Sequence, residues 1–162
     1  MEILYDNHVF DSTISASSEN PFYTFDDALN DNALARVGRT AGDTSQWILF
    51  DATAAVSVDF FYIQSHNITS GATIKIQANA SDSWGSPSID QTVTWSSGYM
   101  LYEWGSTQSY RYWRFSVSDA SNTDDYIELS YVFLGQALSM PGMELSQDFG
   151  RNTTSTATFS NS

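Results

Sequence analysis

Trp84 is the residue with the clearest capacity to bind a ligand, because its neighbours build turns and not strands. The stretch from Ala80 to Ser88 reads ASDSWGSPS, and no apolar alternation there assigns Trp84 to a buried strand face. An exposed indole offers a flat apolar surface to a sugar ring or to a partner's side chain. The structural alternative is that Trp84 folds back over the edge of the domain.

A second group with chemical potential is the run DDALNDNAL that begins at Asp26, where carboxylates and amides are concentrated. Asp26, Asp27 and Asp31 offer the oxygen ligands that Ca²⁺ prefers. A solvated short helix or turn is the alternative interpretation of the same residues. The sequence therefore keeps a structural calcium ion as a candidate, and it predicts no other cofactor.

His66 lacks the neighbours that catalysis requires. It ends an alternating segment and precedes Asn67, and the sequence holds no nucleophile-elbow motif and no His-Glu-x-x-His motif. We interpret the two residues as a pair that ties a turn by hydrogen bonds, with ligand contact as the alternative. No catalytic residue is predicted.

Charge restricts the class of partner. Nineteen acidic residues oppose six basic ones in 162, a formal net charge of −13, and cysteine is absent. Such a chain does not bind nucleic acid by releasing counterions from phosphates, whereas a neutral glycan, a cation or a protein surface is compatible. No apolar run is long enough for membrane insertion. The opening MEILYD lacks the regions of a signal peptide, from which we expect an intracellular origin.

Alternating apolar residues predict about eight short strands and no long helix. Trp113, Phe115 and Val117 share one parity and are expected to face a core, and the strand that starts at Ile127 is expected to end at Gly135. A hairpin is predicted from two further segments, 91–95 and 99–104. This spacing of strands and turns is typical of an all-β sandwich or barrel.

Composition divides the chain into three parts. Residues 1–12 form a segment ahead of the domain, residues 13–135 form the β-sandwich, and residues 136–162 form a polar extension or linker rich in Asn, Ser and Thr. One domain of this size can bury a sizeable core without disulfides.

Six ordered motifs carry a resemblance to a known family, and they are SASS (15–18), WILFD (47–51), HN (66–67), IKIQAN (74–79), YWR (112–114) and IELSYVFLG (127–135). Together they resemble discoidin domains, also called coagulation-factor C-type domains, in the variant carried by tailed-bacteriophage tail proteins. The resemblance implies an all-β galactose-binding-like sandwich, a jelly roll of about eight antiparallel strands, with Trp47 packed inside.

The resemblance also implies where a ligand binds. Discoidin-like domains use loops at one end of the sandwich, which map to Glu19–Phe25, Arg36–Ser45 and Asn79–Ser88 in this sequence. The predicted ligand-binding residues in these loops are Tyr23, Arg39, Asp43 and Trp84. A phenol or indole can stack on a pyranose, and an arginine and a carboxylate can fix its hydroxyl groups.

In carbohydrate-binding members of the family, a glutamate from the final strand completes a calcium site near the aspartate run. The matching position here falls near Ser130, and Glu128 lies one step along the same face.

Two functions follow from this resemblance. The first is a non-enzymatic bacteriophage virion protein, associated with the tail or a fibre, whose sandwich mediates assembly and attachment to a host-surface glycan. Its partners are then other virion proteins or further copies of itself, and its location is the virion. The alternative is a free carbohydrate-binding module. A hydrolase has the least support, since no motif places a pair of catalytic carboxylates.

Overall fold

The computed structural model describes residues 2–30 and 36–139, which form eight strands and one short helix. The elements in chain order are β1 (Glu2–Tyr5), β2 (Thr13–Ala16), α1 (Phe25–Leu29), β3 (Gly38–Arg39), β4 (Gln46–His66), β5 (Thr73–Asn79), β6 (Ile89–Thr92), β7 (Tyr99–Ser118) and β8 (Glu128–Ser139). All pairings between these strands are antiparallel. Within the described residues, no helix combines the length and the apolar character that crossing a membrane requires.

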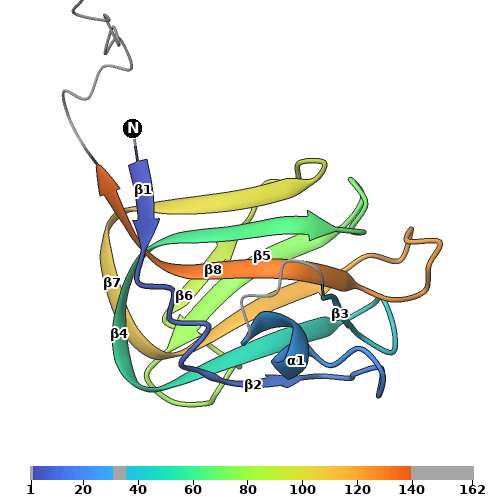
Figure 1. Ribbon diagram of the computed structural model, residues 1–162, viewed down its shortest axis with the longest axis horizontal. Coiled ribbons are helices and arrows are strands. Elements are labelled where there is room, and N and C mark those ends of the chain that lie inside the picture. Colours follow the sequence, from blue (N-terminus) through green and yellow to red (C-terminus); the bar gives the residue numbers. More distant parts are fainter. Residues whose placement is uncertain (1, 31–35, 140–162) are drawn as a thin grey trace, which may run out of the picture.

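The strands form two layers because β4 and β7 each pass through both (Figure 1). In the first layer, named here the β5 layer, the early part of β4 pairs with β2 and with the late part of β7, which continues to β5 and β6. In the second, the β8 layer, the late part of β4 pairs with the early part of β7 and with β8, whose other edge carries β1 and β3.

The prediction of uniformly short strands is wrong for β4 and β7, which have 21 and 20 residues. The register of β4 against β7 shifts between Asp51 and Val56 and again between Val58 and Phe60. Thr53 takes a left-handed conformation in the first irregularity, with φ of 63°. Bulges of this kind bend a strand and increase its twist, so each long strand turns from one layer into the other without a loop.

The core lies between the layers, and the predicted inward face of β7 is confirmed. Trp113, Phe115 and Val117 are at most 1% exposed. Phe61 of the β8 layer stacks on Phe115 of the β5 layer, with ring centroids 5.9 Å apart. Each such side chain contributes about 1.5–3 kcal/mol when it is fully buried.

The predicted hairpin between residues 91–95 and 99–104 is wrong. β6 pairs with β5, whereas Tyr99–Glu103 of β7 pairs with the late part of β4. The two segments therefore belong to different layers. Their closeness in sequence and the Gly-containing connection indicated that the two segments pair with each other. Each segment pairs instead with a strand of its own layer.

Gly135 does not end β8. The strand continues to Ser139, and its last four residues pair with β1. A Cβ atom on Gly135 would lie 2.2 Å from the backbone oxygen of Asp6, so the glycine is needed for the close approach of the N-terminal segment. Val9 of that segment is fully buried in the core.

Trp47 does not pack inside the sandwich as the resemblance implied. It is half-buried, whereas its neighbour Ile48 is fully buried in the core. Successive side chains of a strand point to opposite faces. Because Ile48 and Phe50 point into the core, Trp47 lies on the outer face of the β5 layer.

Candidate ligand-binding site

The double passage of β4 and β7 decides which loops share an end of the sandwich. The connections 40–45 and 67–72, which precede and follow β4, lie at one end together with 17–30 and with 119–127, which follows β7 (Figure 1). We name this the loop end. Thr73 pairs with Ser118 there, whereas Asn79 pairs with Tyr112, roughly 20 Å further along at about 3.3 Å per residue.

Local hydrogen bonds fix the first loop of this end. Thr24 caps α1 by accepting the backbone N–H of Asp27 at 3.3 Å, and the backbone N–H of Phe25 donates to the Glu19 carboxylate at 2.8 Å. The ring of Phe25 is fully buried over Gly38, where a Cβ atom would approach ring carbon Cδ1 to 2.3 Å. Tyr23 is held in turn, because its carbonyl accepts the backbone N–H of Arg39 at 2.8 Å.

Arg39 lies at the centre of the site. Its guanidinium carbon is 4.1 Å from the ring centroid of Tyr23 and 4.8 Å from that of Tyr126, and its Nε donates to Glu128 at 2.6 Å. The hydrogen bond to Glu128 raises the pKa of Arg39 above its already high value, so the cation is permanent. We call Tyr23, Arg39, Tyr126 and Glu128 the arginine cluster.

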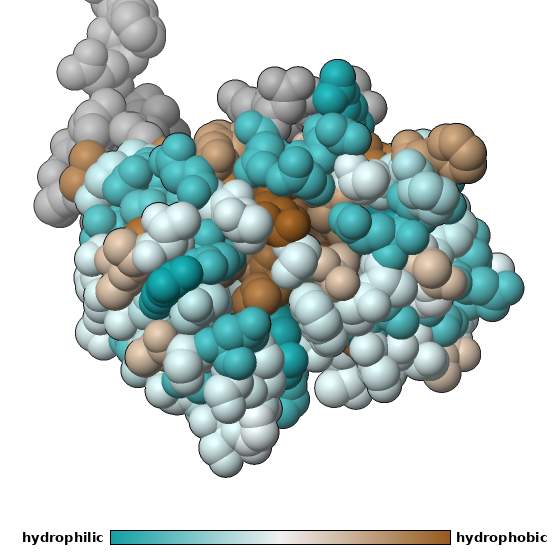
Figure 2. All heavy atoms as spheres, turned by 90° about the horizontal axis from the view of Figure 1, so that it is seen from below, coloured by the Kyte–Doolittle hydropathy of each residue, from teal (hydrophilic) through white to brown (hydrophobic). Residues whose placement is uncertain are grey.

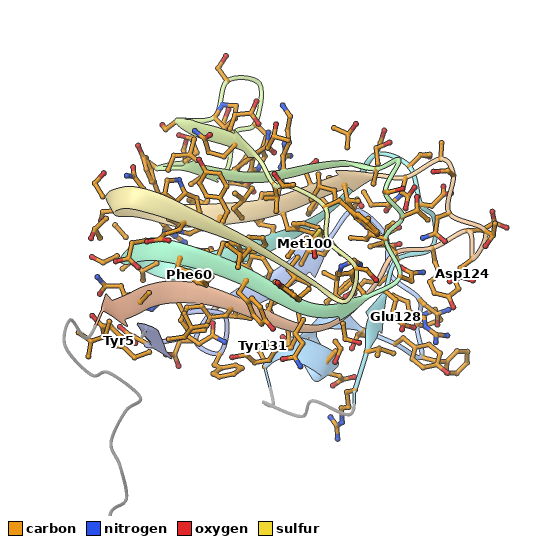
Figure 3. The ribbon with its side chains drawn as sticks, turned by 90° about the horizontal axis from the view of Figure 1, so that it is seen from above. Tyr5, Phe60, Met100, Asp124, Glu128 and Tyr131 are labelled. Carbon is orange, nitrogen blue, oxygen red and sulfur yellow. The ribbon has the colours of Figure 1, made fainter. Side chains whose placement is uncertain are left out.

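Asn67 supports the far side of the cluster. Its Nδ2 donates to the Tyr126 carbonyl at 2.9 Å and to the Asp124 carboxylate at 3.0 Å, while its Oδ1 accepts the Glu128 backbone N–H at 2.8 Å. Figure 3 shows Asp124 and Glu128 at this end of the molecule. One side chain thus fixes the connection 119–127 against the end of β4.

His66 confirms the structural interpretation of the His-Asn pair. Its Nδ1 accepts the Ile68 backbone N–H at 3.2 Å, and its Nε2 lies 3.1 Å from the Ser96 carbonyl. Burial lowers the pKa of His66, which favours the neutral ring. His8 likewise directs Nε2 to a backbone carbonyl, that of Ser57, so neither histidine is paired with a serine hydroxyl.

Asp119 ties the connection 119–127 to the connection 67–72. It is fully buried and accepts both the backbone N–H and the hydroxyl of Thr69 at 2.6 Å, together with the Ser121 hydroxyl at 3.0 Å. Burial alone would raise the pKa of Asp119, but the hydrogen bonds from Thr69 and Ser121 lower it below its ordinary value. The backbone N–H of Asp119 donates to the Asp43 carbonyl at 2.9 Å.

A cavity of about 470 Å³ opens beside the arginine cluster. It is lined by residues of the first loop, α1 and the stretch before β3, which are Phe22, Tyr23, Thr24, Asp27, Ala28, Arg36 and Val37. The side chain of Phe22 is 87% exposed. Tyr23 therefore contacts Arg39 and also borders a cavity large enough for a small ligand.

The structure places three of the four predicted ligand-binding residues at the loop end, and two of them are in contact. Tyr23 and Arg39 are in contact, and Asp43 lies at the same end in the connection before β4. Trp84 lies at the opposite end, because Asn79–Ser88 connects β5 to β6 there. The prediction that this loop shares an end with the other two is wrong.

Trp84 folds back over the outer face of the β5 layer, as its structural alternative predicted. Its ring centroid lies 4.2 Å from the guanidinium carbon of Arg114, and its Nε1 donates to Asp82 at 2.7 Å. Arg114 in turn donates to Gln77, which donates to Asp90. Figure 2, which views this side of the molecule, shows hydrophilic surface around a small hydrophobic centre.

The aspartates proposed for calcium have partners within their own helix. Asp26 accepts from the Asn30 amide, and Asp27 accepts from the Thr24 hydroxyl at 2.8 Å. Asp31 lies outside the described residues, and the part of the chain that is described contains no cluster of three His, Asp or Glu suited to a metal. A calcium ion at this place stays a prediction.

Sequence reasoning missed Tyr126, Glu128 as an arginine partner, and the supporting role of Asn67. The run Asp119–Asp125 by itself predicts only an acidic turn between two strands. Its place at the loop end depends on the bends of β4 and β7, and the run ATAAV at the first bend of β4 contains no Gly, Pro, Asn or Asp to mark it.

Comparison with solved structures identifies the fold. A chitosan-binding module from Paenibacillus sp. IK-5 superimposes with a TM-score of 0.65 at 18% identity, over 82% of this chain and 100% of the module. The lectin domain of lectinolysin, solved with Lewis B antigen, gives 0.66 at 12% identity, over 83% and 99%. A fucose-binding module from Streptococcus pneumoniae gives 0.62 at 15% identity, over 80% and 94%.

No family model matches the sequence, and no curated protein does. The structural likeness confirms the predicted all-β galactose-binding-like sandwich, with its antiparallel strands in a jelly roll.

Proposed function

We propose that this protein is a non-catalytic carbohydrate-binding module that holds a saccharide at the loop end. The observation that carries the proposal is the arginine cluster beside the cavity. Arg39 is fixed between two tyrosine rings and a carboxylate, and Tyr23 faces both Arg39 and the cavity. Aromatic rings stack on the apolar face of a sugar, and charged groups bond its hydroxyls.

Similar solved modules support this choice of ligand class. A second chitosan-binding module of the Paenibacillus enzyme was solved with chitotriose, at a TM-score of 0.63 and 19% identity. The lectinolysin domain was solved with a Lewis antigen. Several proteins of this fold therefore bind saccharides. A fold does not determine which residues bind, so the proposal for this protein rests on its own arginine cluster and cavity.

The test is a glycan array followed by calorimetric titration of the strongest binder with four proteins: wild type, Arg39→Ala, Tyr23→Ala and Arg111→Ala. Arg111 is the matched control, because it also bonds a carboxylate, Asp51 at 2.7 Å, and also lies over a tyrosine ring, Tyr112 at 4.7 Å. Arg39→Ala and Tyr23→Ala should weaken binding at least tenfold, and Arg111→Ala should not. Equal losses in all three variants, or no glycan bound by the wild type, would refute the proposal.

The setting of the module rests on the sequence resemblance alone. We propose that it belongs to a bacteriophage tail or fibre, in the virion, where other virion proteins or copies of itself hold it and a host-surface glycan is its target. Mass spectrometry of purified particles should then detect the chain in stoichiometric amount. Its absence from particles, with glycan binding intact, would leave a free carbohydrate-binding module.

A further inference from the structure

Three tyrosines from three neighbouring strands form a row on the outer face of the β8 layer. Tyr62 of β4 lies between Tyr99 of β7 and Tyr131 of β8, with ring centroids 6.2 and 6.4 Å apart. The register explains the row, because Gln64 pairs with both Tyr99 and Tyr131, and Tyr62 is the next residue of β4 on the same face. We name these three residues the tyrosine row.

The row belongs to a continuous, mostly uncharged face. Nine positions share it, three from each strand, and they are Tyr99, Leu101, Glu103, Gln64, Tyr62, Phe60, Tyr131, Phe133 and Gly135. Glu103 is the one charged residue among the nine, in a chain of net charge −13. Figure 3 looks onto this side of the molecule, with Phe60 and Tyr131 labelled.

The face exposes more apolar surface than folding alone requires. Tyr99 is 49% exposed and Leu101 is 45% exposed. Among the described residues, the large hydrophobic side chains classed as exposed lie either in the first loop, at Phe22 and Tyr23, or on strands of the β8 layer. On this face the exposed apolar surface is therefore concentrated at Tyr99 and Leu101.

The size and chemistry of the face favour a glycan over a protein. Three strands and five residues along each span about 10 by 13 Å between Cα atoms, which is small against the roughly 800 Å² that each partner buries in a standard protein interface. Burial raises the pKa values of Tyr62 and Tyr131, so their hydroxyls remain neutral. None of the nine residues is a cation that would attract an acidic sugar.

We infer that the tyrosine row is a second glycan-binding surface, separate from the loop end, that takes an extended uncharged polysaccharide chain lying across the strands. Successive sugar rings would meet Tyr99, Tyr62 and Tyr131 in turn. The rings of Tyr99 and Tyr62 are inclined by 30° and can both offer a face, whereas Tyr131 is inclined by 63° to Tyr62 and offers an edge. The face is exposed at Tyr99 and Leu101, whereas Phe60, Phe133 and Gly135 are buried and the Asp6 backbone packs against Gly135. The exposed part lies on the outside of a layer, which suits a continuous chain better than a short terminal saccharide. This inference rests on the proposed carbohydrate-binding function.

The test is adsorption of the full chain to cellulose powder and to chitin powder, with the bound fraction measured over a range of solid. The variant is Tyr99→Ala, and the matched control is Leu101→Ala, which removes an equally exposed apolar side chain from the same face of the same strand. Tyr99→Ala should lower the partition coefficient at least fivefold on one of the solids, and Leu101→Ala should change it less than twofold.

Three results would overturn the inference: no adsorption by the wild type, wild-type adsorption by Tyr99→Ala, or equal losses in both variants. Sedimentation velocity could give a fourth such result. If the wild type is a dimer and Tyr99→Ala is a monomer, the tyrosine row binds a second copy of the protein and not a glycan. Arg39→Ala separates the two proposals. Adsorption that needs Arg39 but not Tyr99 would keep the loop-end function and refute the tyrosine row.

Discussion

Arg39 and Glu128 are joined twice: they are register partners in the pairing of β3 with β8, and Arg39 Nε donates to Glu128 Oε2 at 2.6 Å. Both side chains are about one quarter exposed, so water screens part of their attraction. The pair serves to orient the guanidinium between Tyr23 and Tyr126 more than to stabilise the fold.

Glu128→Gln should therefore affect binding more than stability. We expect the free energy of unfolding to fall by no more than about 1 kcal/mol, while glycan affinity falls severalfold because Arg39 loses the partner that directs it. Urea denaturation and calorimetric titration of the same samples measure the two effects. A large loss of stability with unchanged affinity would contradict this account.

Gly38→Ala should destabilise the loop end, since its Cβ would overlap the buried ring of Phe25. Overpacking of this kind costs about 1–3 kcal/mol, and α1 should loosen together with Tyr23. Gly85→Ala is the control, because a Cβ there meets nothing within 4 Å. Thermal melts that show equal shifts for both variants would contradict the prediction.

Asp119→Asn should cost about 1.5–3 kcal/mol, the range for hydrogen bonds to a charged group. The amide replaces an acceptor with a donor opposite the hydroxyl or the backbone N–H of Thr69. Asp125→Asn serves as the control, since Asp125 is exposed and its left-handed φ of 59° suits asparagine. Chemical denaturation near pH 7 compares the two, and similar unfolding midpoints would argue against the role of Asp119.

His66 should make stability depend on pH. Because its pKa is lower in the folded chain than in the unfolded chain, the neutral ring contributes stability above pH 6.5, and that contribution is lost as the pH falls through the folded pKa. His66→Gln should therefore lose less stability than the wild type between pH 7.5 and pH 5. Parallel pH dependences in urea unfolding would show that His66 does not titrate in this window.

The sequence was sufficient to predict the fold class and several strand faces, because apolar residues at every second position force burial on one side. These predictable elements are the inward face of β7, the strand Thr13–Ala16 and the strand Thr73–Asn79. The arginine cluster was only half predictable. Tyr23 and Arg39 lie in loops that the family resemblance indicated, whereas Tyr126 and Glu128 arrive from a segment 87 residues or more beyond Arg39. The bends that bring that segment to the same end follow from irregularities in the pairing of β4 with β7. Gly105 of β7 marks one of them, and the other, in β4, carries no glycine or proline.

Trp84 shows the opposite limit of sequence reasoning. A tryptophan among Ser, Asp, Gly and Pro left two interpretations open, an exposed indole or one that folds back over the domain. The second is the one observed, because the guanidinium of Arg114 lies over the ring. Arg114 lies on the outward face of β7, opposite in parity to the buried Trp113 and Phe115. The sequence alone does not show that Trp84 and Arg114 are in contact, because their contact depends on where the β5–β6 connection lies.

The pairing of β1 with the last residues of β8 also determines how the domain responds to force. Glu2 lies opposite Ser139, so both ends of the described chain leave from one corner (Figure 1). Tension between a preceding and a following segment would open the four register pairs one after another, from the outermost inward, instead of shearing them all at once. The terminal strands would peel away first, while the arginine cluster at the far end stayed folded.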